Sequence, residues 1–133
     1  MNTETIEGMK MVTIPSGSFM MGHNYEYEPG IPERVNRFYA DEQPVHKVSV
    51  KEFQMGEMQV TQAQYEKITG ENFSTFKGGD LPVTNLGPHE IINFCNKLSL
   101  AAGLNPCYDT SETSRTPAKC DFTKNGFRMP TEA

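Results

Sequence analysis

Apolar and polar residues alternate in two short stretches near the start of the chain. The first covers residues 9–14 and predicts a strand. Residues 15–17, Pro-Ser-Gly, supply turn chemistry, and a second short run follows over residues 18–21, so the pattern predicts a hairpin. The preceding residues 1–8 are polar and irregular, and we expect them to be a flexible lead-in.

Alternation returns over residues 45–53, where Val48 and Val50 share one face. This spacing predicts a strand with one face in water, and residues 55–60 continue as strand or bend. His46, at the start of this strand, is a candidate base or metal ligand by residue type. A strand histidine held by a neighbouring carboxylate is the commoner arrangement, and the sequence favours it here.

A first helix is predicted to begin after Thr61. Thr61 and Gln64 have the spacing of a capping box, in which each side chain bonds to the backbone of the other residue. Gly70 provides the left-handed residue that ends many helices. The expected buried stripe of this helix consists of Ala63, Tyr65 and Ile68.

A second helix is predicted to begin at Pro88, because proline suits the first helical position, and to end at Gly103. Its expected apolar face consists of Ile91, Cys95, Leu98 and Ala102. Residues 104–124 are polar and irregular, and Asn125-Gly126 marks a turn. Short strands and two amphipathic helices without β-α-β alternation indicate an α+β fold in a single domain.

Residues 22–44 lack any sustained period and form a predicted long surface loop. Its aromatic side chains, Tyr25, Tyr27, Phe38 and Tyr39, are candidate ligand contacts, although anchoring of the loop on its own domain is the commoner role for such residues.

Composition narrows the classes of partner. The chain has 133 residues, 36% of them hydrophobic, and contains no apolar run long enough for a transmembrane helix or a signal peptide. A net charge of -5 without a Lys/Arg cluster argues against nucleic acid or an anionic membrane as the main partner, and the lack of a long apolar run argues against membrane insertion. We therefore expect a soluble chain whose partner is a protein or a small molecule, with cytoplasm and cell envelope both open as compartments.

The three cysteines give no metal or catalytic pattern. Cys95, Cys107 and Cys120 contain no C-x-x-C pair, and Cys95 falls on the apolar face of its helix. Cys107 and Cys120 flank a polar segment and are either a candidate disulfide in an oxidising compartment or two unrelated thiols. We assign no catalytic, cofactor-binding or metal-ligating residue.

Five segments of the chain also occur, in this order, in one known family. They are IPSGSF with Met21-Gly22, DEQPVH at 41–46, EMQVTQAQY at 57–65, the stretch from Pro82-Val83 to FCNKLS at 94–99, and GFRMPTEA at 126–133. The chain thereby resembles the N-terminal half of the formylglycine-generating enzyme family, also called the sulfatase-modifying factor family. Where many members have Ser-Trp before the second helix, this chain has Gly87-Pro88.

The resemblance implies a C-type-lectin-like fold and assigns residues 9–133 to the N-terminal part of such a domain. The sequence stops within the final motif, and relatives continue into a Trp-rich half, which fits the absence of tryptophan here. In the family that half carries the calcium ligands and the copper-binding cysteine pair, so the resemblance places copper and calcium in a full-length parent and no cofactor in this chain.

Two functions follow from the resemblance. One is a copper-dependent oxidase that converts a sulfatase cysteine to formylglycine, of which this chain would be a part. The other, which we favour, is a binding role like that of bacterial lectin-like surface proteins, because fold alone does not decide activity. A domain cut at this point would expose apolar helix faces, so the expected partner is the C-terminal half or a second chain.

Overall fold

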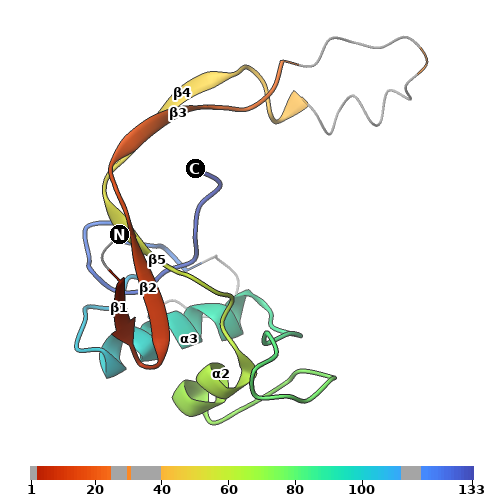
Figure 1. Cartoon of the computed structure of the whole chain (residues 1–133), viewed down its shortest axis with the longest axis vertical. Coiled ribbons are helices and arrows are strands. Elements are labelled where there is room, and N and C mark those ends of the chain that lie inside the picture. Colours follow the sequence, from red (N-terminus) through yellow and green to blue (C-terminus); the bar gives the residue numbers. More distant parts are fainter. Residues whose placement is uncertain (1–2, 25–29, 31–39, 112–117) are drawn as a thin grey trace. The chain divides into compact units, whose positions relative to one another are not determined.

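The computed structural model describes residues 3–24, 30, 40–111 and 118–133. The chain divides into two compact units. Unit 1 comprises Met1–Thr13 and Gln54–Thr131, and unit 2 comprises Ile14–Phe53 and Glu132–Ala133. Figure 1 shows the short strands and the two labelled helices, which, with long irregular segments between them, confirm the predicted α+β class.

The sheet of unit 1 has three strands in the order β1-β2-β5. Strand β1 (Thr3–Ile6) runs antiparallel to β2 (Met9–Ile14), with Ile6 opposite Met9, and β5 is Phe53–Gly56. The predicted flexible lead-in over 1–8 is therefore wrong for its described part. Its residues are ordered because Ile6 packs against the core and Glu7 forms an ion pair of 2.9 Å with Lys67.

Helix α2 (Gln62–Thr69) begins and ends as its sequence predicts. The Thr61 hydroxyl accepts a hydrogen bond from the Gln64 backbone, and the Gln64 side chain accepts one from the Thr61 backbone at 2.9 Å. Gly70 ends the helix with a φ of 82°. These bonds satisfy amide groups that a helix start leaves unpaired, so the capping box is confirmed.

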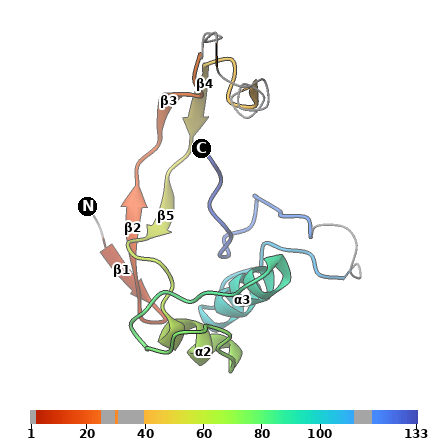
Figure 2. The same ribbon diagram turned by 90° about the vertical axis from the view of Figure 1, so that its right-hand side faces the viewer.

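Helix α3 (Pro88–Ala101) also matches its predicted limits, with Pro88 in its first turn and Gly103 at a φ of 71° just beyond it. Cys95 and Leu98 are buried on its inner face, together with Phe94. Figure 2 shows α2 and α3 on the same side of the sheet of unit 1.

The core of unit 1 lies between this sheet and the two helices. The Tyr65 and Phe94 rings stack with their centroids 5.2 Å apart, which joins α2 to α3. The buried members of the core are Met9, Met11, Tyr65, Phe94, Cys95 and Leu98. The core therefore draws its residues from elements separated by long stretches of sequence.

A buried amide holds the segment between the two helices. Gln62 is only 2% exposed, and its Nε2 donates to the carbonyl oxygens of Phe76 at 2.9 Å and Pro82 at 3.4 Å. Its Oε1 accepts from Asn72 Nδ2 at 3.0 Å and from the Gly78 backbone at 3.1 Å. The predicted stripe of α2 is corrected accordingly: Gln62 is buried, whereas Ala63 is exposed.

Unit 2 contains a two-stranded ribbon of β3 (Gly17–Met21) and β4 (His46–Val50). The strands are antiparallel, with Phe19 opposite Val48. The predicted pairing of residues 9–14 with 18–21 is wrong, because β2 pairs within unit 1 and β3 pairs with β4. The His46 ring is held by a carbonyl, with Nδ1 2.9 Å from the Pro44 oxygen, and not by any carboxylate among the described residues.

Candidate functional site

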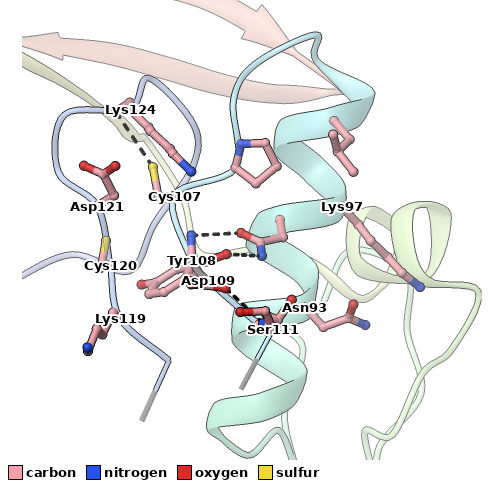
Figure 3. A pocket seen from close by; sticks show the side chains of 14 residues that line it. Asn93, Lys97, Cys107, Tyr108, Asp109, Ser111, Lys119, Cys120, Asp121 and Lys124 are labelled. Atoms are coloured by element: carbon pink, nitrogen blue, oxygen red, sulfur yellow. Dashed lines mark hydrogen bonds between the residues drawn. The ribbon is translucent and has the colours of Figure 1, made fainter. Parts of the chain in front are cut away.

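A pocket of about 890 Å³ lies between α3 and two segments that follow it, residues 106–111 and 119–124. Its volume is within the range of small-molecule sites. Figure 3 shows Asn93 and Lys97 on the α3 side, and Lys119, Cys120 and Asp121 on the opposite side. The remaining lining residues are Asn96, Leu100, Pro106, Cys107, Tyr108, Asp109, Thr110, Ser111 and Lys124.

The two segments on the far side of the pocket pair with each other. Tyr108 stands opposite Cys120 in an antiparallel bridge. The Asp109 amide donates to the Lys119 carbonyl at 3.0 Å, and the Asp121 amide donates to the Cys107 carbonyl at 2.8 Å. The described residues of the two segments therefore form one hydrogen-bonded wall of the pocket.

Asn96 attaches this wall to α3. Its Nδ2 donates to the Tyr108 carbonyl at 2.9 Å, and its Oδ1 accepts from the Tyr108 amide at 3.2 Å (Figure 3). One side chain thus satisfies both backbone groups of Tyr108, as a neighbouring strand would.

Ser99, which is fully buried, anchors the residues that follow the pocket wall. Ser99 Oγ donates to the Cys95 carbonyl at 2.7 Å and accepts from the Phe127 amide at 2.8 Å. A side chain at Gly126 would collide with the Asn105 carbonyl, so this close approach requires glycine. The motif at 126–129 therefore fixes the position of the pocket wall.

Charged groups of both signs surround the pocket. Asp109 accepts a hydrogen bond from the Ser111 amide at 2.9 Å, and Asp121 accepts bonds from the Thr123 hydroxyl and amide. The side-chain and backbone hydrogen bonds from Ser111 and Thr123 lower the pKa of Asp109 and Asp121 respectively. Both carboxylates are therefore ionised and engaged with their own turns.

The three lysines of the pocket have no ion pair with any residue that the structure describes. Lys97 comes from α3, whereas Lys119 and Lys124 come from the hairpin side. By contrast, Lys10 and Lys67 elsewhere in unit 1 are paired with Glu57 and Glu7. At longer range the charges of the pocket do interact, because Lys124 and Lys119 help to lower the pKa of Asp109 and Lys124 helps to lower that of Asp121.

Comparison with known families decides what kind of domain carries this pocket. All of residues 1–133 match the family described as sulfatase-modifying factor enzyme 1-like domain. The chain belongs to this family. The resemblance seen in the sequence motifs is thereby confirmed.

Solved structures give the same fold for this family member. The variable protein 1 of Treponema denticola superposes with a TM-score of 0.75 at 29% identity, covering 98% of this chain and 53% of that one. PvdO from Pseudomonas aeruginosa (TM-score 0.58, 23% identity, 81% of this chain and 46% of that one) and CarF (0.66, 22%, 95% and 54%) share it at lower identity. The fold is therefore of the C-type-lectin-like, formylglycine-generating-enzyme type.

A curated relative matches over part of the chain. It is the chaperone protein LppX of Paenibacillus barcinonensis, 32% identical over 98 residues, which are 65% of this chain and 35% of that protein. The chain spans about half the length of the solved structures it resembles.

The cysteines of this family member are all free thiols. Cys107 is buried and donates its Sγ–H to the Gly126 carbonyl at 3.2 Å. Because Cys120 faces Tyr108 across the bridge, neighbouring Cys107 projects to the other face of the hairpin. The structure therefore does not contain the disulfide proposed for Cys107 and Cys120, which stays a prediction for oxidising conditions.

Burial also controls the acidity of two thiols. Desolvation, with smaller effects from Cys107 and Cys120, raises the pKa of Cys95 to about 11. Desolvation likewise raises the pKa of Cys120, which is only partly exposed. Both thiols are therefore protonated at neutral pH and are poor nucleophiles.

The candidate ligand contacts predicted from the sequence, Tyr25, Tyr27, Phe38 and Tyr39, lie outside the described residues. The pocket itself was not predicted. Asn96 and Lys97 lie on the polar side of an amphipathic helix, and no sequence signal separates such residues from an ordinary solvent-facing surface. Two candidates from the sequence, Cys107 and Cys120, do line it, although they were predicted as a disulfide and not as part of a ligand site.

Two negative findings concern the described part of the chain. No helix there has the length and apolar character needed to cross a membrane. Among the same residues, no group of three or more histidine, cysteine or acidic side chains is placed to hold a metal ion.

Proposed function

We propose that this chain is the scaffold part of a formylglycine-generating-enzyme-type domain, that it has no catalytic activity by itself, and that it serves ligand or protein binding in its parent. The observation that carries the proposal is the burial of two thiols among the described residues. Cys95 is buried in the core, which raises its pKa to about 11, and desolvation also raises the pKa of Cys120. Both are therefore less available as thiolates than an exposed cysteine is.

Family membership favours a second candidate, in which the chain is part of a copper-dependent oxidase that converts a sulfatase cysteine to formylglycine. In that case the copper-binding cysteine pair would be supplied by another part of the parent, since the resemblance places it in the C-terminal half. The two candidates therefore differ in whether the parent contains this cysteine pair and forms the aldehyde.

The experiment that separates them incubates the purified chain, and in parallel its full-length parent, with Cu(I), oxygen, a reductant and a cysteine-containing sulfatase peptide. We expect the peptide thiol to persist and no aldehyde to form in either reaction, as judged by mass spectrometry and hydrazide capture. A formylglycine-generating enzyme of full length is the positive control. Copper-dependent aldehyde formation by the parent would overturn the binding proposal and establish the oxidase, and its formation by this chain alone would overturn the proposed lack of activity.

The partner proposed for this scaffold is a further polypeptide segment, either a C-terminal half in its parent or a second chain. Large apolar side chains of unit 1 support this, because Phe76 is 81% exposed and Leu100 and Phe122 are each 65% exposed. Exposed apolar clusters mark interfaces or aggregation sites. We expect strong binding of a hydrophobic dye that is lost when the partner is bound, and a dye-silent compact monomer would contradict the proposal.

A further inference from the structure

The turn at Asn125-Gly126 contains the only Asn-Gly pair of the chain. In such a pair the main-chain nitrogen of the glycine can attack the side-chain carbonyl carbon of the asparagine and close a succinimide ring. Because glycine has no Cβ, no side chain of that residue obstructs the approach. The sequence therefore supplies both reacting groups at this turn, and the surrounding contacts decide how each one is held.

The carbonyl group that would be attacked is held by a donor from outside the turn. The Asn125 Oδ1 atom accepts a hydrogen bond from the Asn105 backbone amide at 3.0 Å. This donor identifies the oxygen end of the side chain, because a backbone N–H requires an acceptor. It also stabilises the negative charge that develops on the oxygen during attack. The side-chain nitrogen, which must leave, belongs to an exposed residue.

The attacking group is not engaged elsewhere. The Gly126 N–H donates no hydrogen bond to any residue in the described part of the chain. Asn85 provides a contrast, because it is also exposed and outside the helices, but Leu86 follows it. Its Nδ2 donates to the Phe73 carbonyl at 3.1 Å and to the Thr75 hydroxyl at 2.8 Å. At Asn85 the leaving nitrogen is therefore retained, whereas at Asn125 the oxygen is held instead.

We infer from these contacts that Asn125 is a site of spontaneous covalent modification in the folded chain. The Gly126 nitrogen bonds to the Asn125 Cγ atom while its proton passes to hydroxide or water. The Cγ–Nδ2 bond breaks, and the nitrogen takes a proton from water and leaves as ammonia. Water then opens the ring. Cleavage at Cγ yields aspartate, whereas cleavage at the main-chain carbonyl yields isoaspartate, whose main chain runs through Cβ and is longer by that atom.

The turn has no room for a longer main chain. A Cβ atom at Gly126 would already collide with neighbouring backbone. The residues that follow are held by their amides, with Phe127 donating to Ser99 Oγ at 2.8 Å and Met129 donating to the Tyr108 hydroxyl at 3.0 Å. We expect isoaspartate to release both amides from their acceptors. Aspartate adds no main-chain atom and keeps an acceptor oxygen, so it should leave both bonds in place.

The test incubates the purified 133-residue chain at mildly alkaline pH, folded and in guanidinium chloride. Peptide mapping by mass spectrometry locates the new acid, and a protein isoaspartate methyltransferase measures isoaspartate. In the folded chain we expect Asn125 to react no more than about threefold slower than in guanidinium, and Asn85 to react at least about tenfold slower than Asn125. Asn125→Gln is the matched control. It keeps the amide but moves the carbonyl out of reach of ring closure, and should abolish methylation at this turn.

Hydrogen exchange tests the structural consequence. The isoaspartate form, separated by chromatography, should exchange its Phe127 and Met129 amides at least about tenfold faster than the fresh chain. Asn125→Asp carries the same new charge without the extra main-chain atom. It should accelerate these amides by less than about threefold.

A folded chain that reacts at Asn125 more than about threefold slower than the denatured chain would overturn the inference, because the fold would then protect the turn. Equal reaction at Asn85, or undiminished methylation of Asn125→Gln, would overturn the assignment to this pair. Unchanged exchange at Phe127 and Met129 in the isoaspartate form would overturn the consequence. These readouts involve neither ligand nor copper, so they are independent of the binding role and of the oxidase assay.

Discussion

Units 1 and 2 of this chain use their apolar side chains in different ways. Unit 1 buries Met9, Met11, Tyr65, Phe94 and Leu98 in a core shared by a sheet and two helices. Among the described residues of unit 2 none is fully buried, and Phe19 is 41% exposed. A two-stranded ribbon is at best marginally stable without further packing. The stability of the chain should therefore reside in unit 1.

The largest expected effect on stability comes from shortening a buried side chain of unit 1, in comparison with an exposed side chain of unit 2. Leu98→Ala should lower the free energy of unfolding of unit 1 by about 3 kcal/mol, because it leaves a cavity around a side chain that is 2% exposed. Phe19→Ala should cost unit 1 less than about 0.5 kcal/mol, since substitutions away from a core are nearly neutral. Native-state hydrogen exchange of α3 amides measures both. Equal losses would refute the difference between the units.

The next effect concerns alkaline pH. The pKa of Cys95 rises from 9.0 in the unfolded chain to about 11 in the folded one. The neutral thiol therefore contributes its full stabilisation of the folded chain below pH 9. That contribution is lost as the pH rises from 9 through 11, and amounts to roughly 2–3 kcal/mol. Denaturant unfolding of the unsubstituted chain and of its Cys95→Ala variant measures this loss. We expect it in the unsubstituted chain alone. A loss of the same size in Cys95→Ala would assign it to the tyrosines.

A smaller effect on stability is expected from the residue that caps the start of α2. Thr61→Ala removes the acceptor of the Gln64 amide and should destabilise α2 by about 1 kcal/mol. Thr61→Ser keeps the hydroxyl and serves as the matched control. We expect amide exchange in α2 to accelerate in the alanine variant and the exchange of β3 and β4 to stay unchanged. Faster exchange in both units would mean that they unfold together.

The last prediction concerns the reactivity of the cysteines and not the stability of the fold. All three cysteines belong to unit 1 and are free, so the denatured chain should contain three titratable thiols. In the folded chain Cys120 should be alkylated first, because Cys95 and Cys107 are buried. Peptide mapping identifies the labelled residue. A single titratable thiol, mapped to Cys95, in the chain purified under oxidising conditions would show that the predicted Cys107–Cys120 disulfide forms.

Sequence reasoning predicted the helices of unit 1 well because their signals are local. Thr61, Gln64 and Gly70 act within α2 itself, and Pro88 acts within α3. The strand pairing was predicted wrongly for residues 9–21. A turn sequence between two short apolar runs is compatible with several partners, and the choice depends on β1, β4 and β5, which lie elsewhere in the sequence.

The candidate site was largely beyond such reasoning. Asn96 is an ordinary polar residue on a helix until Tyr108 is brought beside it, and the pocket lysines have no distinguishing spacing. The motif GFRMPTEA gave the family correctly, since long motifs are specific. What that motif does, through Ser99 and Gly126, became visible only when distant segments were placed together.

The amide of Gln62 makes the segment between the helices vulnerable to a change of very few atoms. Its nitrogen donates hydrogen bonds to two carbonyl groups and its oxygen accepts hydrogen bonds from two N–H groups, so both ends of the amide are needed. Hydrolysis of this amide to a carboxylate would leave an acceptor facing the Phe76 and Pro82 carbonyls, where a donor is needed. Deamidation of this one buried side chain would therefore release the segment between α2 and α3, although no residue of that segment had changed.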